Sequence, residues 1–188
     1  MARPLGSLVL VVGASGVGKD TLIGGARQAL DNDKRFAFLR RIVTRAAGLG
    51  GEEHDILDLG TFLHMEEAGR FALSWEANTL RNVLPLSLDT DLSLGRVVVA
   101  SVSRHAVAQA RAKYPNCAVI LVTAEISRRA ERLSRLGRET ADQISARLAR
   151  DSAAVPAGIE PLIIDNSGAI AMGVTAFVMA LRAIAAQD

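Results

Sequence analysis

The chain has 188 residues, of which 49% are hydrophobic and 22% are charged, as expected for one soluble domain with a full hydrophobic core. The net charge of +2 gives no argument for a nucleic-acid partner, and the only cysteine, Cys117, excludes an intramolecular disulfide and a thiolate metal cluster. Because no apolar run approaches the roughly 18 residues of a membrane span, we expect a cytoplasmic protein without a membrane partner.

Short apolar runs rich in β-branched residues predict buried strands. The runs are SLVLVV (7–12), RVVVASV (96–102), AVILVTA (118–124) and PLIID (161–165). Continuous runs of this kind are typical of parallel strands covered on both faces. The run at 7–12 follows an arginine, as in a signal peptide, but it is too short and leads straight into a glycine-rich loop, so we interpret it as a strand.

Helical patterns separate these strands. They cover 19–30, 104–113, 126–137, 140–154 and 169–186. The pattern at 140–154 begins with a Thr140–Gln143 capping box, T-x-x-Q. Alternating strands and helices indicate right-handed crossovers and an α/β fold.

Residues 44–95 interrupt the alternation with several glycines, many acids and few long apolar runs. We interpret them as an insertion or small subdomain within one domain spanning 1–188. The core then comprises 1–43 and 96–188, and the arginine-rich stretch at about 135–152 is a candidate for a mobile lid.

The sequence GASGVGKDTL (13–22) has the spacing of a phosphate-binding loop. Glycines let successive N–H groups face an anion, and the following helix adds its positive N-terminal end. Lys19 would neutralise the β- and γ-phosphates. Because a predicted strand precedes the loop and a helix follows it, we favour a nucleotide site over an ordinary turn. The candidate ATP-binding residues here are Gly13, Ala14, Ser15, Gly16, Val17, Gly18, Lys19, Asp20 and Thr21.

Asp20 occupies the position where a serine or threonine hydroxyl normally binds Mg²⁺. A carboxylate can ligate Mg²⁺ directly or through one of the ion's waters. Without metal, its charge beside the phosphates should weaken nucleotide binding. Asp20 also favours the helix dipole, and both interpretations can hold together. Thr21 fits a hydroxyl contact to an earlier phosphate.

Seven arginines lie between positions 128 and 150: Arg128, Arg129, Arg132, Arg135, Arg138, Arg147 and Arg150. Acidic residues lie between these arginines in the sequence, so we assign most of the arginines to solvated helices on which they form ion pairs. Arg138, beside Gly137 in a predicted turn, and Arg147, beyond the capping box, are the better lid candidates. Phosphoryl transfer needs such cations against the charge of the transferring group.

The middle segment offers further candidates, each with an ordinary alternative. Arg45 could hold an acceptor phosphate through two hydrogen bonds, or it could be a surface residue. We assign His54 to a solvated loop rather than to a metal, and Trp75 to the core rather than to ligand stacking. Asp89 and Asp91 are equally compatible with Mg²⁺ or substrate binding and with turns.

Taken together, these segments resemble the guanylate kinase-like branch of the nucleoside-monophosphate kinases over nearly the whole chain. The matching segments are GASGVGKDTL, TR (44–45), GE (51–52), GRF (69–71) with Trp75, RLSRLGRET with ISARLAR, and IIDNS (163–167). The resemblance implies a P-loop, three-layer α/β fold with a parallel core sheet, a small acceptor-binding insertion and an arginine-rich lid. It further implies that Arg45 and Glu52 bind the acceptor, that Arg138 and Arg147 are lid arginines, and that Asn166 lies on the adenine side.

Two departures argue against guanine as the acceptor base. Where guanylate kinases have a Tyr-Tyr-Gly segment, this chain has Arg81-Asn82-Val83, and its only tyrosine, Tyr114, lies elsewhere. Where they have Asp-x-Asp after a core strand, the chain reads VVVASVSR, with no acid. A site that lacks these polar partners would reject guanine, because base recognition depends on placed hydrogen bonds.

The chain more closely resembles the ribose 1,5-bisphosphate phosphokinases of phosphonate degradation. The shared features are the aspartate after the loop lysine, LSWEAN (73–78), Ser103-Arg104 before AVAQARAKYP, and GRET with ARLAR. The resemblance implies in-line transfer of the γ-phosphoryl of ATP, with Mg²⁺, to the 1-phosphate of ribose 1,5-bisphosphate. Arg104 joins Arg45 among the acceptor-binding candidates. A phosphate acceptor is already ionised, so no general base is required.

Two other functions stay open at this point. One is a nucleoside-monophosphate kinase with another acceptor, and the other is a non-catalytic guanylate kinase-like binding module. Lys19 and both lid arginines favour catalysis. We therefore expect ATP and a small phosphorylated sugar as ligands; the oligomeric state is open, with a homodimer as one option.

Overall fold

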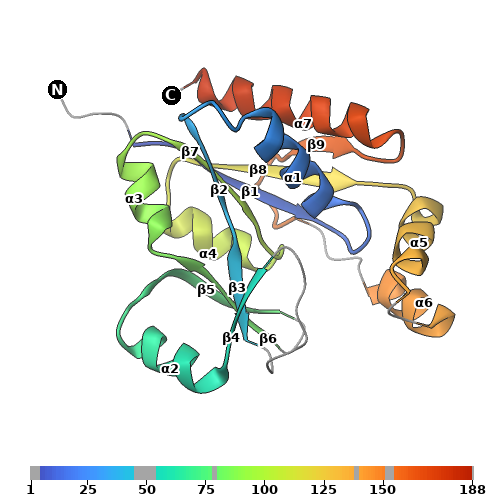
Figure 1. Cartoon of the computed structure of the whole chain (residues 1–188), viewed down its shortest axis with the longest axis horizontal. Coiled ribbons are helices and arrows are strands. Elements are labelled where there is room, and N and C mark those ends of the chain that lie inside the picture. The colour runs from blue at the N-terminus through green and yellow to red at the C-terminus, as the bar shows by residue number, and fades with distance from the viewer. Residues whose placement is uncertain (1–4, 45–53, 78–79, 138–139, 151–154, 188) are drawn as a thin grey trace.

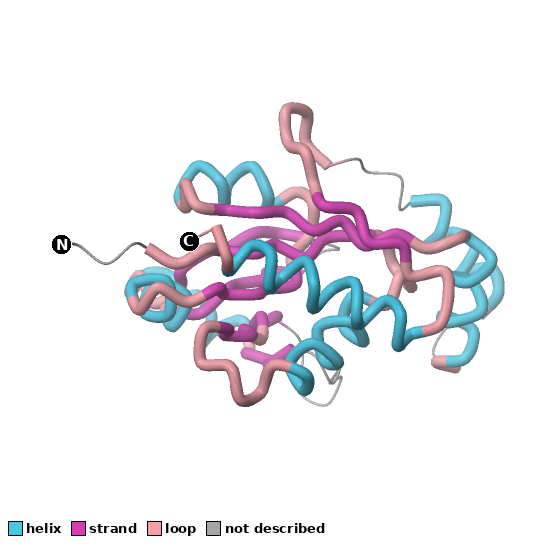
Figure 2. The backbone as a smooth tube through the Cα atoms, turned by 90° about the horizontal axis from the view of Figure 1, so that it is seen from above, coloured by secondary structure: helices cyan, strands magenta, loops and turns pink. Residues whose placement is uncertain are grey.

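The chain folds around two β-sheets (Figure 1). The computed structural model describes residues 5–44, 54–77, 80–137, 140–150 and 155–187. The larger sheet forms the centre of the molecule, with helices on both of its faces (Figure 2). The smaller sheet lies below it in Figure 1.

The core sheet has five strands, all parallel, in the order β2-β7-β1-β8-β9. They are β1 (Leu8–Gly13), β2 (Phe36–Leu39), β7 (Val97–Ser101), β8 (Cys117–Thr123) and β9 (Leu162–Asp165). β1 lies in the middle, with Leu8 opposite Val98 of β7 and Cys117 of β8. Because parallel strands are covered on both faces, the side chains of Leu8 to Val12 are all fully buried.

Helices α1 (Lys19–Ala29) and α7 (Ile170–Ala185) cover one face of the core sheet. They pack on the side chains that alternate along β1 and β7, such as Val9 and Val99. Helices α3 (Ser87–Ser93) and α4 (Ala106–Lys113) cover the other face together with part of the smaller sheet. The hydrophobic core therefore consists of two layers divided by the sheet.

The smaller sheet has the order β4-β3-β6-β5. Its strands are β3 (Arg41–Thr44), β4 (His54–Leu57), β5 (Phe71–Ala77) and β6 (Leu80–Pro85), with α2 (Leu59–Glu67) between β4 and β5. β3 follows core strand β2 after a single residue, so one continuous extended segment connects the two sheets. The hydroxyl of Tyr114, the residue directly after α4, donates to Asp89 of α3 at 2.7 Å. It also lies 3.3 Å from the carbonyl oxygen of Ala72 in β5, so it connects the two parts of the molecule.

Helices α5 (Ile126–Arg135) and α6 (Ala141–Arg150) follow β8 and pack on one another at the end of the molecule where β1 ends (Figure 1). The predicted capping box at the start of α6 is confirmed: Thr140 N donates to Gln143 Oε1 at 2.8 Å, and Gln143 N to Thr140 Oγ1 at 3.4 Å. No helix in the described part of the chain has the length and apolar character to cross a membrane.

The predicted α/β fold with a parallel core sheet is confirmed, and the strands and helices expected in the core are present. The core strand β2 was not predicted. It has four residues between charged neighbours, and of these only Phe36 is buried, because β2 is an edge strand of the sheet. A short edge strand has too few apolar residues to give a clear pattern.

We expect Phe177→Ala to lower the free energy of unfolding by about 3–5 kcal/mol, because it leaves a cavity between α1, α7 and the sheet. Phe177 is completely buried, whereas Met179, two residues along the same helix, is 66% exposed. Met179→Ala is the matched control and should change stability by less than about 0.5 kcal/mol. Urea unfolding of the three proteins measures the difference, and equal destabilisation would place α7 outside the core.

Candidate active site

The phosphate-binding loop (13–18) connects β1 to α1 at the carboxyl edge of the core sheet. Gly16 and Gly18 have φ angles of 78° and 87°, in the left-handed region that glycine adopts readily. A Cβ atom on Gly16 would stand 2.9 Å from the carbonyl oxygen of Arg129, and one on Gly18 would stand 2.6 Å from the amide nitrogen of Asn166. Conformation and close packing therefore both require glycine here.

Lys19 begins α1 and folds back over the loop. Its ammonium donates to the carbonyls of Gly13 at 2.7 Å and Ala14 at 3.2 Å. This places a positive charge at the N-terminal end of α1, which itself attracts anions. The predicted phosphate-binding lysine thus lies against the first turn of the loop.

Two arginines of α5 donate hydrogen bonds to the backbone carbonyls of the remaining loop residues. Arg129 is 8% exposed, and its Nε donates to the carbonyl of Ser15 at 2.9 Å. Arg132 donates from one terminal nitrogen to Val17 O at 3.1 Å and Gly16 O at 3.5 Å, and from the other to Asn166 O at 2.6 Å. Our assignment of most of these arginines to a solvated helix was wrong for both residues.

The same assignment is confirmed for Arg128 and Arg135. Each pairs with Glu131 on the exposed side of α5, at 3.3 Å and 2.6 Å respectively. One sequence signal could have separated the two kinds of arginine. Arg129 stands four residues before Leu133, and both are buried in α5, so Arg129 lies on the helix stripe that faces inward.

Asn166 lies directly after β9 and is 2% exposed. Its side-chain amide donates to Val17 O at 2.7 Å, and its backbone N–H donates to Thr123 O at 2.8 Å. The residue therefore connects β8 and β9 to the phosphate loop. A role in ATP binding stays a prediction, and the contacts in the structure would make it act through the loop.

Arg147 of α6 reaches the same loop, with its Nε donating to Ser15 Oγ at 2.7 Å. The predicted lid arginine and the loop are thus in contact. Arg138, Arg45 and Glu52, the other expected lid and acceptor-binding residues, lie outside the described residues.

Asp20 and Thr21 are both exposed in the first turn of α1. Among the described residues, no group of three His, Cys, Asp or Glu side chains could hold a metal ion. A cation at Asp20 would therefore be shared with hydroxyl groups, water and the phosphates of a ligand. Arg104 lies at the same edge of the sheet, half-buried in the turn between β7 and α4.

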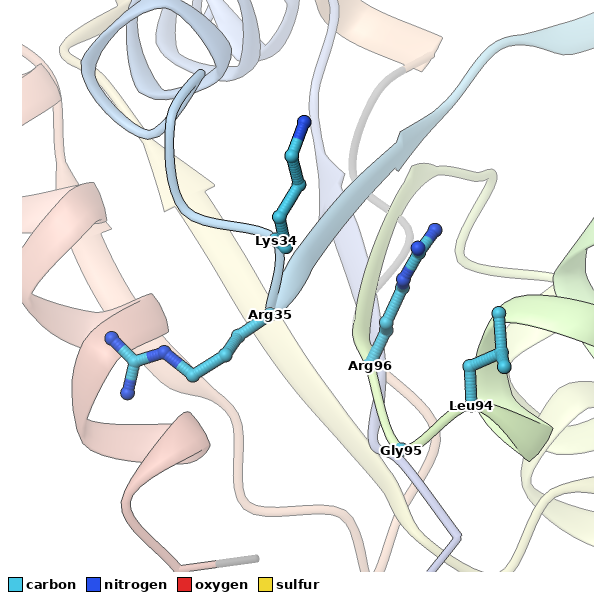
Figure 3. A pocket seen from close by; sticks show the side chains of 5 residues that line it. All are labelled: Lys34, Arg35, Leu94, Gly95 and Arg96. Atoms are coloured by element: carbon cyan, nitrogen blue, oxygen red, sulfur yellow. The ribbon is translucent and has the colours of Figure 1, made fainter.

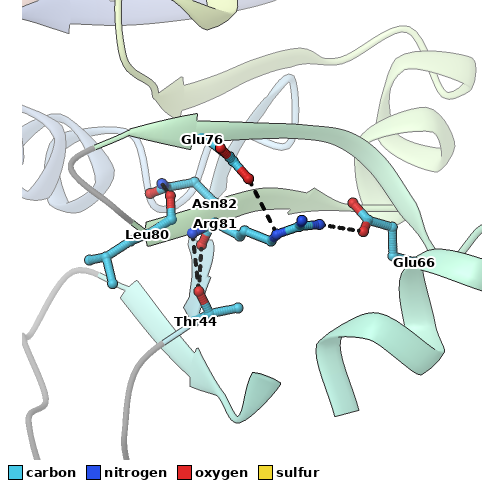
Figure 4. A network of polar contacts seen from close by, with 6 residues as sticks. All are labelled: Thr44, Glu66, Glu76, Leu80, Arg81 and Asn82. Carbon is cyan, nitrogen blue, oxygen red and sulfur yellow. Dashed lines mark hydrogen bonds and ion pairs between the residues drawn. The ribbon is translucent and has the colours of Figure 1, made fainter. Parts of the chain in front are cut away.

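In the smaller sheet, Arg81 is at the centre of a polar network (Figure 4). Its guanidinium pairs with Glu66 at 2.8 Å and Glu76 at 3.4 Å, and lies 5.6 Å from the centre of the Phe62 ring. Its backbone N–H donates to Thr44 Oγ1 at 3.0 Å. Thr44 is thereby fixed at the end of β3, immediately before the segment that contains Arg45.

A cavity of about 130 Å³ lies beside this network. Its lining residues are Phe62, Glu66, Ser74, Trp75, Glu76 and Arg81. Trp75 is 7% exposed and belongs to the hydrophobic core between the two sheets, as the ordinary interpretation predicted.

Asp89 and Asp91 both have structural partners. Asp89 accepts from the Tyr114 hydroxyl, and Asp91 pairs with Arg96 at 2.9 Å. Burial and the Asp89 carboxylate together raise the pKa of Tyr114 well above its usual value, so the hydroxyl stays protonated and keeps donating. Burial likewise raises the pKa of Cys117 to about 11, which leaves its thiol protonated at neutral pH.

A second cavity, of about 270 Å³, lies at the opposite edge of the core sheet, where β2 and β7 begin (Figure 3). Lys34, Arg35, Leu94, Gly95 and Arg96 line it. Arg35 is paired with Asp33, and its side chain points away from Arg96. This cavity is separate from the phosphate loop, which lies at the carboxyl edge.

The chain is similar to known proteins in sequence and in fold. The chain is 43% identical over 182 residues to the ribose 1,5-bisphosphate phosphokinase of Brucella abortus biovar 1 (strain 9-941), covering 97% of this chain and 95% of that protein. It is 46% identical over 182 residues to the protein of the same name from Chelativorans sp. (strain BNC1), covering 96% and 87%. No family model matches the sequence.

Among solved structures, the guanylate kinase from Anaplasma phagocytophilum matches with a TM-score of 0.66 at 14% identity, over 97% of this chain and 88% of that one. A gluconokinase from Sinorhizobium meliloti 1021 matches with a TM-score of 0.53 at 17% identity, over 98% and 96%. At such low identity these matches establish the fold alone, which is that of the P-loop kinases.

Arg132→Ala should weaken ADP binding by about tenfold or more, because a hydrogen bond to a charged group contributes about 1.5–3 kcal/mol and each 1.4 kcal/mol is tenfold in affinity. Arg128→Ala is the matched control, since Arg128 lies on the exposed side of the same helix. Isothermal titration calorimetry gives the dissociation constants, and thermal unfolding confirms that both variants fold. Equal ADP affinity for the two variants would mean that Arg132 does not position the loop.

Proposed function

The chain belongs to the family of ribose 1,5-bisphosphate phosphokinases, and we propose that it transfers the γ-phosphoryl group of ATP to ribose 1,5-bisphosphate, giving 5-phosphoribosyl 1-diphosphate and ADP. The observation that carries this proposal is the phosphate loop with Lys19, held by arginines of α5 and α6, in a chain that matches these relatives over nearly its full length.

Residues 13–21, which comprise the loop and the first turn of α1, would supply the ATP side of the site. Their backbone N–H groups and the N-terminus of α1 would bind the phosphates, and Lys19 would add a full positive charge near the β- and γ-phosphates. Asn166 would support ATP binding by fixing the loop at Val17.

The residues present fit a magnesium ion. Mg²⁺ prefers oxygen ligands and keeps several waters, and the exposed carboxylate of Asp20 stands in the first turn after the loop. Asp20 would hold the ion directly or through water. When bound, Mg²⁺ neutralises charge on the β- and γ-phosphates.

On the acceptor side we assign Arg45, Glu52 and Arg104 to substrate binding. An oxygen of the 1-phosphate attacks the γ-phosphorus of ATP, the bond from that phosphorus to the β,γ-bridging oxygen breaks, and ADP leaves. Because the attacking oxygen is already ionised, the protein has to align the two phosphates rather than remove a proton.

Lys19, Arg138 and Arg147 would stabilise the charge on the transferring group. Arg147 already contacts the loop at Ser15, so a small movement of α6 could bring its guanidinium to the phosphates. Closure of the lid at about 135–152 would also exclude water and limit hydrolysis of ATP. The same proposal includes the division of the chain into a core, an acceptor-binding insertion and a lid. It also includes a cytoplasmic location and the absence of nucleic-acid and membrane partners.

The fold is also compatible with a nucleoside-monophosphate kinase, since the solved guanylate kinase shares it. A coupled assay with ATP and Mg²⁺ separates the two functions by comparing ribose 1,5-bisphosphate with GMP, AMP and dGMP. We expect turnover with the sugar bisphosphate to exceed that with any nucleotide. Efficient use of GMP with no turnover of the sugar would contradict the proposal, and failure to bind ATP would favour a non-catalytic module.

Lys19→Ala should lower kcat by at least about a hundredfold, because it removes a cation that stabilises the transition state. Lys34→Ala is a control of the same chemical type: Lys34 is exposed at the opposite edge of the core sheet. Steady-state kinetics with saturating ATP measures the effect, and circular dichroism checks that the fold is intact. Retained activity in a folded Lys19→Ala variant would remove the loop from the catalytic site.

A further inference from the structure

Strand β7 lies directly beside β1, and from its last residue, Ser101, the chain leads into the turn before α4. Val11 of β1 is opposite Ser101, and the backbone N–H of Val102 donates to Val11 O at 3.1 Å. This bond belongs to the last pair of the parallel register, Val11 and Ser101. Two further steps along both chains lead to Gly13, where the phosphate loop begins, and to Ser103.

Ser103 also lies on the side of the sheet that α1 covers. Along β7, Val97 and Val99 pack in the core layer of α1 and α7, whereas Val98, Ala100 and Val102 pack in the opposite layer. Side chains alternate between the two faces of a strand. This alternation places Ser101 and Ser103 on the face of α1, the helix that begins with Lys19 and Asp20.

The Ser103 hydroxyl is buried and has no hydrogen-bond partner in the structure. Leaving a buried polar group unpaired is costly, so such a group calls for a specific explanation. Capping of α4 does not provide one: the cap residue of that helix is His105, and Ser103 contributes only its backbone carbonyl, to Ala106 N at 3.0 Å.

Magnesium coordination provides that explanation. In P-loop enzymes Mg²⁺ is held by a serine or threonine hydroxyl of the loop and by an aspartate carboxylate from elsewhere in the fold. Here a carboxylate, Asp20, stands in the first turn after the loop, and a hydroxyl, Ser103, stands two residues after β7, within a stretch, VVVASVSR, that contains no acid. The total charge of the two side chains is unchanged.

We propose that the carboxylate and the hydroxyl of the magnesium site have exchanged places in this protein, with Asp20 supplying the charge and Ser103 the hydroxyl, directly or through a metal-bound water. The inference rests on the proposed use of a metal–nucleotide complex. It explains two sequence departures by one arrangement: the aspartate after the loop lysine and the absence of an acid after β7.

The test is a double-mutant cycle that restores the usual arrangement. Asp20→Ser removes the carboxylate, Ser103→Asp adds a second one beside the phosphates, and the double variant moves the single carboxylate to the strand. Binding of Mn²⁺, which suits the same oxygen ligands, to the protein–ADP complex is measured by electron paramagnetic resonance. We expect Asp20→Ser to weaken Mn²⁺ binding by about tenfold or more, and the double variant to recover most of that loss.

Further variants make the outcome specific. Ser103→Ala should weaken Mn²⁺ binding while leaving ADP affinity without metal unchanged. Ser101→Asp, two residues earlier on the same strand face, should not rescue Asp20→Ser. A double variant that binds Mn²⁺ no better than Asp20→Ser would overturn the exchange, as would rescue by Ser101→Asp or a Ser103→Ala variant with unchanged Mn²⁺ affinity.

These measurements contain no acceptor, so they separate this inference from the proposed function. If the sugar bisphosphate is not phosphorylated but the cycle shows rescue, the metal site stands and the acceptor is wrong. If the sugar is phosphorylated but rescue fails, the function stands and Ser103 is not part of the metal site. Thermal unfolding of each variant confirms that it is folded.

Discussion

The site depends on how the carbonyl groups of the phosphate loop are satisfied. A loop that turns its N–H groups toward an anion turns its carbonyls away, into the protein, where each needs a donor. Here every carbonyl from Gly13 to Val17 accepts a side-chain hydrogen bond. The donors are Lys19, Arg129, Arg132 and Asn166, from three separate segments. The loop is therefore held in one conformation by the surrounding fold, and a preorganised loop lowers the cost of binding a ligand.

The need to pair the loop carbonyls explains which parts of the site can be predicted from the sequence. The loop, its strand and its helix have local signals, namely glycine spacing and an apolar run, and they were found. Arg129 and Arg132 have no local signal for their role, because they contact carbonyls more than 110 positions earlier in the chain. Their helix carries acidic residues that are typical of a solvated surface, and its exposed side does form ion pairs. Only the inward stripe shared by Arg129 and Leu133 distinguishes the two sides.

The smaller sheet was visible in the sequence only as a break in the alternation. Two of its strands, β3 and β4, have only four residues, and the side chain of Arg81 on β6 reaches Glu66 of α2. The network around Arg81 depends on pairing between Thr44 and a strand 37 residues later, which no local pattern reveals. The resemblance is accordingly still the basis for the acceptor-binding roles of Arg45 and Glu52 and for the lid role of Arg138. The bond between Arg81 and Thr44 shows how the residue before Arg45 is anchored.

The same loop contacts explain how an aspartate can occupy the position after the lysine. A carboxylate next to a bound nucleotide repels its phosphates, at a cost that depends on the surrounding charge. In this protein Lys19, Arg129 and Arg132 converge on the loop, with Arg129 almost fully buried, where screening by solvent is weak. Their positive charges would attract the phosphates of a nucleotide at the loop and so offset the repulsion that the Asp20 carboxylate adds. An aspartate at this position and arginines that contact the loop from the later helix α5 would then be two parts of one electrostatic arrangement: the arginines lower the cost of placing a carboxylate beside bound phosphates.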